Sequence, residues 1–180
     1  WGNQTYGNGM TRAQYGSSKG NPAPYTCLKD YRQDIPTINN NSGGYCTGSI
    51  TAGNRSSAEI ISLVSTACGI NPQTLLVLLQ KEQALISDDW PWSIQYRSAT
   101  GYGCPDTAAC DTQYYGFTNQ VRWAARMFRA IMNASPTWYT PYILGTNYIR
   151  YSPTSSCGGS NVNIVNRSTQ ALYNYTPYQP

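Results

Sequence analysis

The stretch NPQTLLVLLQKEQALI, residues 71–86, is the longest strongly apolar segment in an otherwise polar chain. Asn71 is suited to cap a helix because its side chain accepts from an early backbone N–H, and Pro72 fits the first helical position, where its missing donor costs nothing. The apolar positions recur with helical spacing, at Leu75, Leu78, Leu79, Leu85 and Ile86. The same spacing places Glu82, one of two glutamates in the chain, on this face. The stretch therefore predicts an amphipathic helix with an acid among leucines.

The composition limits the kinds of fold and partner. With 180 residues and 40% apolar side chains, the chain suits one domain with a modest core. Sixteen tyrosines and five tryptophans against two phenylalanines favour aromatic rings with a polar handle, which suit sugar-facing grooves as well as cores. A net charge of +4 without a basic run predicts no nucleic-acid partner, and anionic cell-wall glycans fit equally well.

Histidine is absent, which excludes Ser-His and Cys-His nucleophile pairs in their common forms and makes an ordinary zinc site improbable, so we expect no cofactor. Six cysteines without CxxC spacing, in a chain rich in Asn, Ser, Thr and Gly, indicate a disulfide-bonded extracellular protein. Proximity along the chain favours three pairs: Cys27–Cys46, Cys104–Cys110 and Cys68–Cys157. No signal peptide or membrane-length segment is present, so we expect a mature secreted domain with no membrane insertion.

The chain divides into an arm and a domain. Residues 1–54 lack sustained periodicity and contain turn-prone runs, which predicts a loop-rich arm packed on a domain formed by residues 55–180. Ser56 to Glu59 form a capping box, which predicts a helix that ends at Gly69 and assigns Glu59 to capping rather than chemistry. A second amphipathic helix is expected over residues 117–133, and a short one over residues 168–173.

Residues 87–116 form a long loop that holds aromatics, acids and amides, and long loops in compact domains tend to be functional. Aromatic side chains here are candidates for stacking on sugar rings: Trp92, Tyr96, Tyr102, Tyr114 and Tyr115. Gln95 in the loop and Asn119 after it could reach the N-acetyl or hydroxyl groups of a glycan. The alternative is that some of these residues serve only packing.

Glu82 is the leading candidate for chemistry. Burial in an apolar wall raises the pKa of a carboxyl group, and an acid that stays protonated near neutral pH can deliver a proton to a leaving oxygen. The structural alternative is an acid paired with Lys81, with Arg97 or with an arginine of another helix. The helix position alone leaves both interpretations open.

Residues 78–86 resemble the catalytic-glutamate helix of the lysozyme-like lytic transglycosylases, in which an apolar run precedes Gln-Glu-Ser; Gln83 stands where that family usually has serine. Residues 99–103 lie about where the family has its Gly-Leu-Met-Gln turn, and Asn119 resembles its third motif. Residues 171–174 are similar to the Ala-Tyr-Asn motif, whose tyrosine, here Tyr173, contacts the catalytic carboxyl.

The chain also resembles domains of secreted actinobacterial proteins that carry Leu-Gln-Lys-Glu-Gln, Trp-Pro-Trp and Gly-Tyr-Gly segments and a terminal Asn-Tyr-Thr-Pro-Tyr-Gln-Pro. The two resemblances cover residues 56–180. They imply a mainly α fold, in which a lysozyme-like helical domain carries long disulfide-stapled loops. The loop-rich N-terminal arm, which they do not cover, is expected to pack on this domain. The resemblances also imply a secreted, cell-wall-associated glycosidase whose partner is peptidoglycan.

The implied reaction is cleavage of the β-1,4 bond between N-acetylmuramic acid and N-acetylglucosamine. Glu82 would protonate the glycosidic oxygen and then, as a carboxylate, accept the proton of the muramoyl 6-hydroxyl or activate a water. An inverting hydrolase needs a second carboxylate, for which Asp106 in its Cys-Pro-Asp turn is the first candidate, although it could simply cap that turn. Asp88, Asp89 and Asp111 are further candidates.

Two other functions remain open. One is a non-catalytic glycan-binding or adhesin domain, which the tyrosine-rich loops and the sparse carboxylates also suit. The other is a glycosidase that acts on a different cell-envelope glycan, because fold does not set the substrate.

Overall fold

The computed structural model describes residue 5 and residues 8–39, 44–106, 108–133, 137 and 139–179. The chain forms two compact units, Trp1–Ala125 and Arg126–Pro180. The elements of the first unit are α1 (Arg12–Ser18), η1 (Leu28–Asp30), β1 (Arg32–Ile35), β2 (Ile38–Asn39), β3 (Ser49–Ile50), β4 (Gly53–Ser56), α2 (Ser57–Cys68), α3 (Pro72–Gln83), α4 (Ser93–Arg97) and η2 (Thr112–Tyr114). Helix α5 (Phe117–Asn133) begins in the first unit and ends in the second, which adds β5 (Gly145–Arg150), η3 (Ser155–Cys157), β6 (Gly159–Ile164) and α6 (Arg167–Tyr175).

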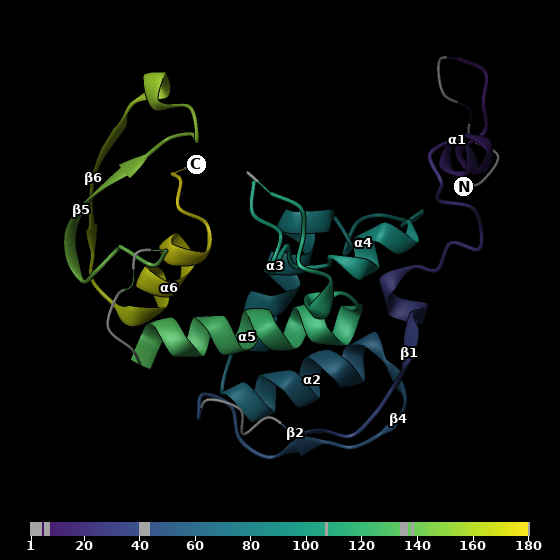
Figure 1. The fold of residues 1–180 in the computed structure, drawn as a ribbon, viewed down its shortest axis with the longest axis horizontal. Coiled ribbons are helices and arrows are strands. Elements are labelled where there is room, and N and C mark those ends of the chain that lie inside the picture. The colour runs from purple at the N-terminus through teal and green to yellow at the C-terminus, as the bar shows by residue number, and fades with distance from the viewer. Residues whose placement is uncertain are drawn as a thin grey trace. The chain divides into compact units, whose positions relative to one another are not determined.

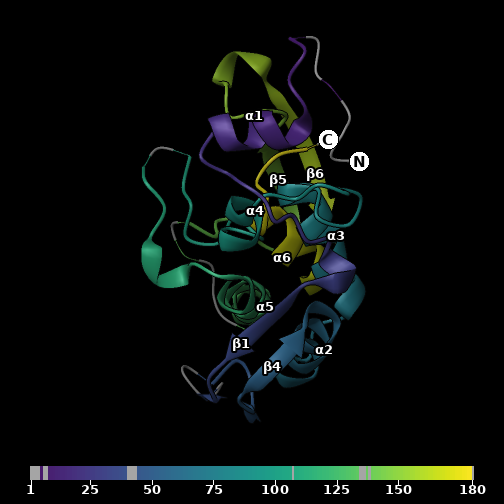
Figure 2. The ribbon, with the colours of Figure 1, turned by 90° about the vertical axis from the view of Figure 1, so that its right-hand side faces the viewer.

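The fold is mixed α/β, so the prediction of a mainly α, lysozyme-like helical domain is wrong. Besides six α-helices, the described residues form three two-stranded antiparallel sheets, β1–β4, β2–β3 and β5–β6. In the first of these sheets Arg32 lies opposite Ser56 and Ile35 lies opposite Gly53. Figures 1 and 2 show β4 beside α2. The predicted boundary at residue 54 falls inside β4, and the arm contains α1.

Capping residues set the starts of α2 and α3 as the sequence predicts. The Ser56 hydroxyl accepts from the Glu59 N–H, and the Glu59 carboxylate accepts from the Ser56 N–H at 2.7 Å, which completes the capping box. Gly69 ends α2 with φ 63°, a left-handed conformation that glycine adopts at little cost. The Asn71 side chain accepts from the Gln73 N–H at 2.9 Å and starts α3.

Helix α3 ends at Gln83, three residues before the predicted end at Ile86. Ala84 follows with φ 54°, and among the described residues it is the one non-glycine with positive φ. The Gln80 side chain holds the turn, because its carbonyl accepts from the N–H groups of Ile86 and Ser87, each at 3.1 Å. This tight turn places the residues after the helix close to Glu82.

The core of the first unit lies between its helices and β3. Its most deeply buried apolar side chains, each at most 1% exposed, include Ile50, Ile60, Val64, Leu75, Leu79, Leu85, Phe117, Val121 and Ala124. Leu75, Leu78, Leu79 and Leu85 of the predicted leucine stripe are thus buried, whereas Ile86, predicted to lie on the same face, is 48% exposed. The rest of α3 faces solvent, as Val77 shows with 67% exposure.

Two disulfides are formed, and one of them was predicted. Cys104–Cys110 closes the loop before η2 as expected. The predicted pairs Cys27–Cys46 and Cys68–Cys157 are wrong, because Cys46 bonds to Cys68. The Thr47 N–H donates to the Ala67 carbonyl at 2.7 Å, which brings the loop before β3 beside the end of α2. Cys27 and Cys157 are free thiols.

The second unit packs the β5–β6 hairpin with α6. Helix α6 contains the short helix predicted at residues 168–173. Gln170 is 1% exposed and donates to the Tyr142 carbonyl at 2.8 Å, and Asn174 donates to the same oxygen at 2.9 Å. Two buried amides therefore fix the segment before β5. Among the described residues no helix is long and apolar enough to span a membrane.

Candidate functional site

Glu82 lies in the last turn of α3, at the end of the leucine stripe. Leu78 and Leu79 on this stripe are buried, but the Glu82 side chain keeps 25% exposure. Its Oε1 accepts from Lys81 Nζ at 2.8 Å, which is the ion pair given as the structural alternative above. The carboxylate is therefore half-buried and charge-paired, on the rim of the apolar core.

The Gly-Tyr-Gly turn, residues 101–103, lies close to Oε2, the other oxygen of the Glu82 carboxylate. Gly101 has φ +70°, and a Cβ at this position would lie 3.2 Å from Glu82 Oε2. The Gly101 N–H donates to the Ser98 carbonyl at 3.0 Å, and the Gln83 amide donates to the same carbonyl at 3.3 Å. Residues 99–103 are the segment that resembles the family's Gly-Leu-Met-Gln turn, and the structure brings Gly101 of this segment close to Glu82.

Gln120 organises this turn from α5, and the sequence analysis missed it. The side chain is 0% exposed. Its Oε1 accepts from the N–H groups of Thr100 at 3.2 Å and Tyr102 at 3.1 Å, and its Nε2 donates to the carbonyls of Tyr102 at 2.9 Å and Tyr114 at 2.8 Å. The available signal was a glutamine inside an apolar helical stripe, three residues after Phe117.

Three aromatic rings cluster beside the turn. Tyr102 and Tyr114, both predicted as sugar-binding residues, lie with ring centroids 4.8 Å apart. Trp123 of α5, which was not predicted, lies 5.8 Å from Tyr102 and 5.2 Å from Tyr114. Gly103 makes room for this aromatic cluster, because a Cβ there would overlap the Tyr114 ring at 2.4 Å. Tyr102 directly follows Gly101 in the chain. The aromatic cluster therefore begins at the residue after the glycine that lies close to Glu82.

Two further predicted binding residues, Tyr96 and Gln95, make structural contacts. Tyr96 stacks on Tyr31 with centroids 3.9 Å apart and donates to the Thr26 carbonyl at 2.6 Å, and burial raises the pKa of its hydroxyl. The Gln95 amide donates to the Gln83 carbonyl at 2.8 Å and to Asp88 at 2.9 Å. Tyr96 therefore serves the core, and Gln95 holds the segment after α3.

The remaining predicted binding residues make local contacts. The ring of Trp92 lies 6.0 Å from that of Tyr15 in the arm. Arg97 stacks 4.8 Å above the Tyr115 ring, and the Asn119 amide donates to the Tyr115 carbonyl at 3.1 Å.

Tyr173 lies in α6 of the second unit, where it is half-buried. Its predicted contact with Glu82 in the first unit stays a prediction.

The other carboxylates have different surroundings from Glu82. Arg12 of α1 pairs with Asp89 at 2.8 Å and with Asp88 at 3.9 Å. Asp111 caps η2 by accepting from the Gln113 N–H at 3.1 Å. Asp106 is exposed in the Cys104–Cys110 loop, and within the described residues no ion pair or hydrogen bond engages its side chain.

The Glu59 side chain completes the capping box of α2, as predicted. Hydrogen bonds from the backbone and side chain of Ser56 lower the pKa of Glu59. Across the described part of the chain no group of three or more His, Cys, Asp or Glu side chains could hold a metal ion.

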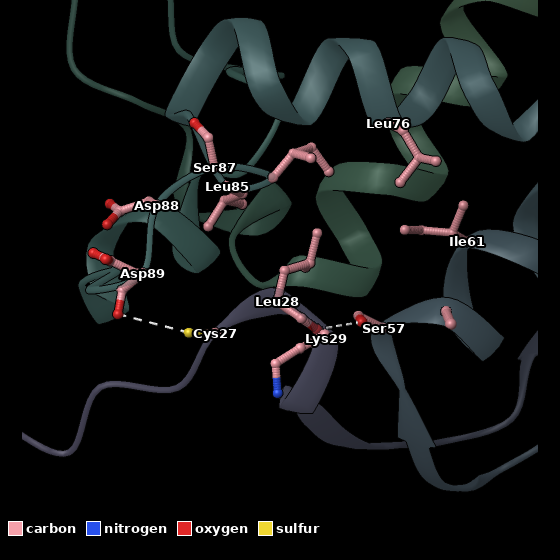
Figure 3. Close-up of a pocket in the computed structure, with 12 residues that line it drawn as sticks. Cys27, Leu28, Lys29, Ser57, Ile61, Leu76, Leu85, Ser87, Asp88 and Asp89 are labelled. Atoms are coloured by element: carbon pink, nitrogen blue, oxygen red, sulfur yellow. Dashed lines mark hydrogen bonds between the residues drawn. The ribbon is translucent and has the colours of Figure 1, made fainter. Parts of the chain in front are cut away.

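Two neighbouring cavities lie beside α2 and α3. The first, of about 410 Å³, is also lined by residues 27–29 and 85–89, and the second, of about 540 Å³, lies between the two helices and the turn that joins them. Ala58, Ile61 and Leu76 line both. Figure 3 shows Ile61 and Leu76 facing each other from the two helices, with Leu28 below them in the view on the segment that also carries Cys27 and Lys29. Glu82 lines neither of these cavities, so they are separate from the surroundings of the carboxylate.

No family model matches the chain, and no curated protein or solved structure is significantly similar to it. The functional assignment therefore depends on the residues and geometry of this chain.

Proposed function

We propose that the protein is a secreted glycosidase that cleaves the β-1,4 bond between N-acetylmuramic acid and N-acetylglucosamine in peptidoglycan, with Glu82 as its essential acid and base. The observation that carries the proposal is the approach of the Gly101 backbone to Glu82 Oε2. Gly101 is followed directly by Tyr102, whose ring belongs to the aromatic cluster with Tyr114 and Trp123, so the turn links the half-buried carboxyl to that cluster. An acid with a fixed position beside aromatic rings suits a sugar bond held by stacking.

The reaction begins with Glu82 in its protonated form. The carboxyl gives its proton to the glycosidic oxygen, the C1–O bond breaks, and the N-acetylglucosamine side leaves with a new hydroxyl. The Glu82 carboxylate then accepts the proton of the muramoyl 6-hydroxyl as that oxygen bonds to C1, which gives a 1,6-anhydro product. Lys81 Nζ, 2.8 Å from Oε1, stabilises the carboxylate between the two steps.

A hydrolase outcome needs a water in place of the 6-hydroxyl and, in an inverting enzyme, a second carboxylate about 6.5–9.5 Å from the first. Asp106 is the candidate for that group, because the other aspartates of the region are engaged: Asp88 and Asp89 pair with Arg12, and Asp111 caps η2. Secretion fits the two disulfides, which form in oxidising compartments.

The second candidate function is a glycan-binding domain without catalysis. The ion pair between Glu82 and Lys81 favours it, because this pair is the structural role given above as the alternative to catalysis. In this function the aromatic cluster binds sugar rings and Glu82 only fixes the turn.

Incubation of the purified protein with purified cell walls distinguishes the two. The glycosidase proposal predicts release of soluble muropeptides and its loss in Glu82→Gln, with folding and wall binding unchanged. Mass spectrometry of the released fragments separates the anhydro ends of a transglycosylase from the reducing ends of a hydrolase. Equal inactivity of the wild type and Glu82→Gln on several walls, with binding retained, would support the binding domain.

A further inference from the structure

The Gln120 side chain hydrogen-bonds to the residues on both sides of Gly101, the glycine that lies close to Glu82 Oε2. Thr100 and Tyr102 flank Gly101, and their N–H groups donate to the same oxygen, Gln120 Oε1, at 3.2 and 3.1 Å. The Thr100 hydroxyl lies 3.1 Å from that oxygen as well. One side chain therefore fixes the backbone immediately before and after Gly101, whose missing Cβ gives Glu82 Oε2 its space.

The other end of the same amide joins the turn to the aromatic cluster. Gln120 Nε2 donates to the carbonyl of Tyr102 at 2.9 Å and to that of Tyr114 at 2.8 Å. These two residues carry rings of the aromatic cluster, 4.8 Å apart. The backbone on both sides of Gly101 and the backbone that carries two of the rings are thus held by one buried side chain.

The chemistry of these contacts requires an amide. A glutamate of the same length would set a carboxylate oxygen against two carbonyl oxygens, which are also acceptors. A methionine would leave two N–H groups and two carbonyls without their buried partner. Glutamine satisfies both sets, which accounts for a fully buried polar residue in the stripe that also contains Phe117 and Val121.

We propose that Gln120 is a positioning residue that holds the Gly101 turn against Glu82 and aligns the proton donor with sugars bound at Tyr102 and Tyr114. The inference rests on the proposed glycosidase function. Gln120 itself touches no reacting atom. Its effect is on the placement of the acid relative to the bond that is cut, and small displacements of a catalytic group have large effects on rate.

The test compares variants at position 120 with a matched buried glutamine of the second unit. Gln120→Met and Gln120→Glu should lower kcat for muropeptide release by about ten- to a hundredfold, with KM changed less than about threefold, at temperatures where circular dichroism shows them folded. Gln170→Met removes a similarly buried amide, 1% exposed, and should leave kcat within about twofold of wild type.

A milder variant keeps the test decisive if the substitutions at position 120 do not fold. Thr100→Val removes the hydroxyl contacts to the backbone carbonyl and to the side-chain oxygen of Gln120 but keeps the Thr100 N–H bond, and it should lower kcat a few-fold in the same direction. Folded variants of Gln120 or Thr100 with wild-type kcat and an unchanged pH–rate profile would overturn the inference. Full activity of Glu82→Gln would instead show that the proposed function is wrong, and the two failures are thereby distinguished.

Discussion

The two glutamates of the chain end up in opposite surroundings, although both lie on amphipathic helices. Glu59 sits at the start of α2, where Ser56 donates to it and Arg32 and Arg55 lie at 3.8 and 3.7 Å. Glu82 sits at the end of α3, where the nearest cation is Lys81 and one oxygen faces Gly101. The start of a helix provides free N–H donors that stabilise a carboxylate, and the end of a helix provides none.

The difference explains why only one of the two suits acid chemistry. Every hydrogen bond at Glu59 serves α2 and keeps its carboxylate charged. Glu82 contributes nothing to the capping of α3, whose end is held by Gln80. The proposed role of Glu82 as an acid and base is compatible with this position, because the carboxyl is not needed to cap its helix.

The largest expected effect comes from shortening Glu82. Glu82→Asp withdraws the carboxyl from Gly101 and should lower muropeptide release by about a hundredfold, because a displacement of about 1 Å can cost that much. Glu59→Asp is the matched control and should leave the rate within about twofold of wild type. Similar rates for both aspartate variants would remove the distinction between the two glutamates.

The next effect comes from filling the space beside Glu82. Gly101→Ala places a methyl group 3.2 Å from Glu82 Oε2 and should lower activity about tenfold. Gly48→Ala is the control, because Gly48 has φ +71° and no atom lies within 4 Å of an added Cβ. This variant has the same backbone strain as Gly101→Ala but no contact between the new methyl group and a neighbour. Each should cost about 1 kcal/mol in the free energy of unfolding by denaturant. An equal loss of activity in both would assign the effect to strain alone.

A smaller effect, on stability and not on activity, is expected for Glu59→Gln. Because hydrogen bonds from Ser56 lower the pKa of Glu59, its contribution to stability is present above the ordinary value of 4.5 and is lost as the pH falls through the lowered value. The variant should therefore melt below the wild type at pH 7, and the gap in Tm should narrow in acid. A gap that does not depend on pH would show that the charge of Glu59 is not what stabilises α2.

The smallest effect tests how the two helices end. Gly69 ends α2 in a left-handed conformation without strain, whereas Ala84 adopts a similar conformation after α3 with a Cβ. Ala84→Gly should leave the free energy of unfolding unchanged or raise it by up to about 1 kcal/mol. A marked decrease in thermal scans would mean that the Ala84 methyl group contributes packing that outweighs its backbone strain.

Local signals in the sequence predicted the starts of α2 and α3 and the end of α2, whereas α1 and α4 were not predicted. Ser56 with Glu59, Asn71 with Pro72, and Gly69 are caps whose effect is contained within a few residues. The positions of the strands could not be predicted because β1 and β4 are four residues long and largely polar, as Gln33 illustrates, so they lack the alternation that marks a half-buried strand.

Features that depend on the fold were harder to predict. Cys46 bonds to Cys68 because the hairpin of β2 and β3 returns to the end of α2, and spacing along the chain does not contain that information. The role of Gln120 requires the turn 18 residues earlier in the chain to lie on α5. Tyr96 shows the opposite error, since a tyrosine in a functional-looking loop proved to be part of the core.

The most direct measurement is the rate of muropeptide release from one wall preparation by three proteins: wild type, Glu59→Gln and Glu82→Gln. All three should bind the wall, and Glu59→Gln should cut at close to the wild-type rate. Glu82→Gln should be slower by at least about a hundredfold, which is the loss expected for a general acid. A folded Glu82→Gln that releases muropeptides at the wild-type rate would contradict the assignment of Glu82 as the catalytic acid.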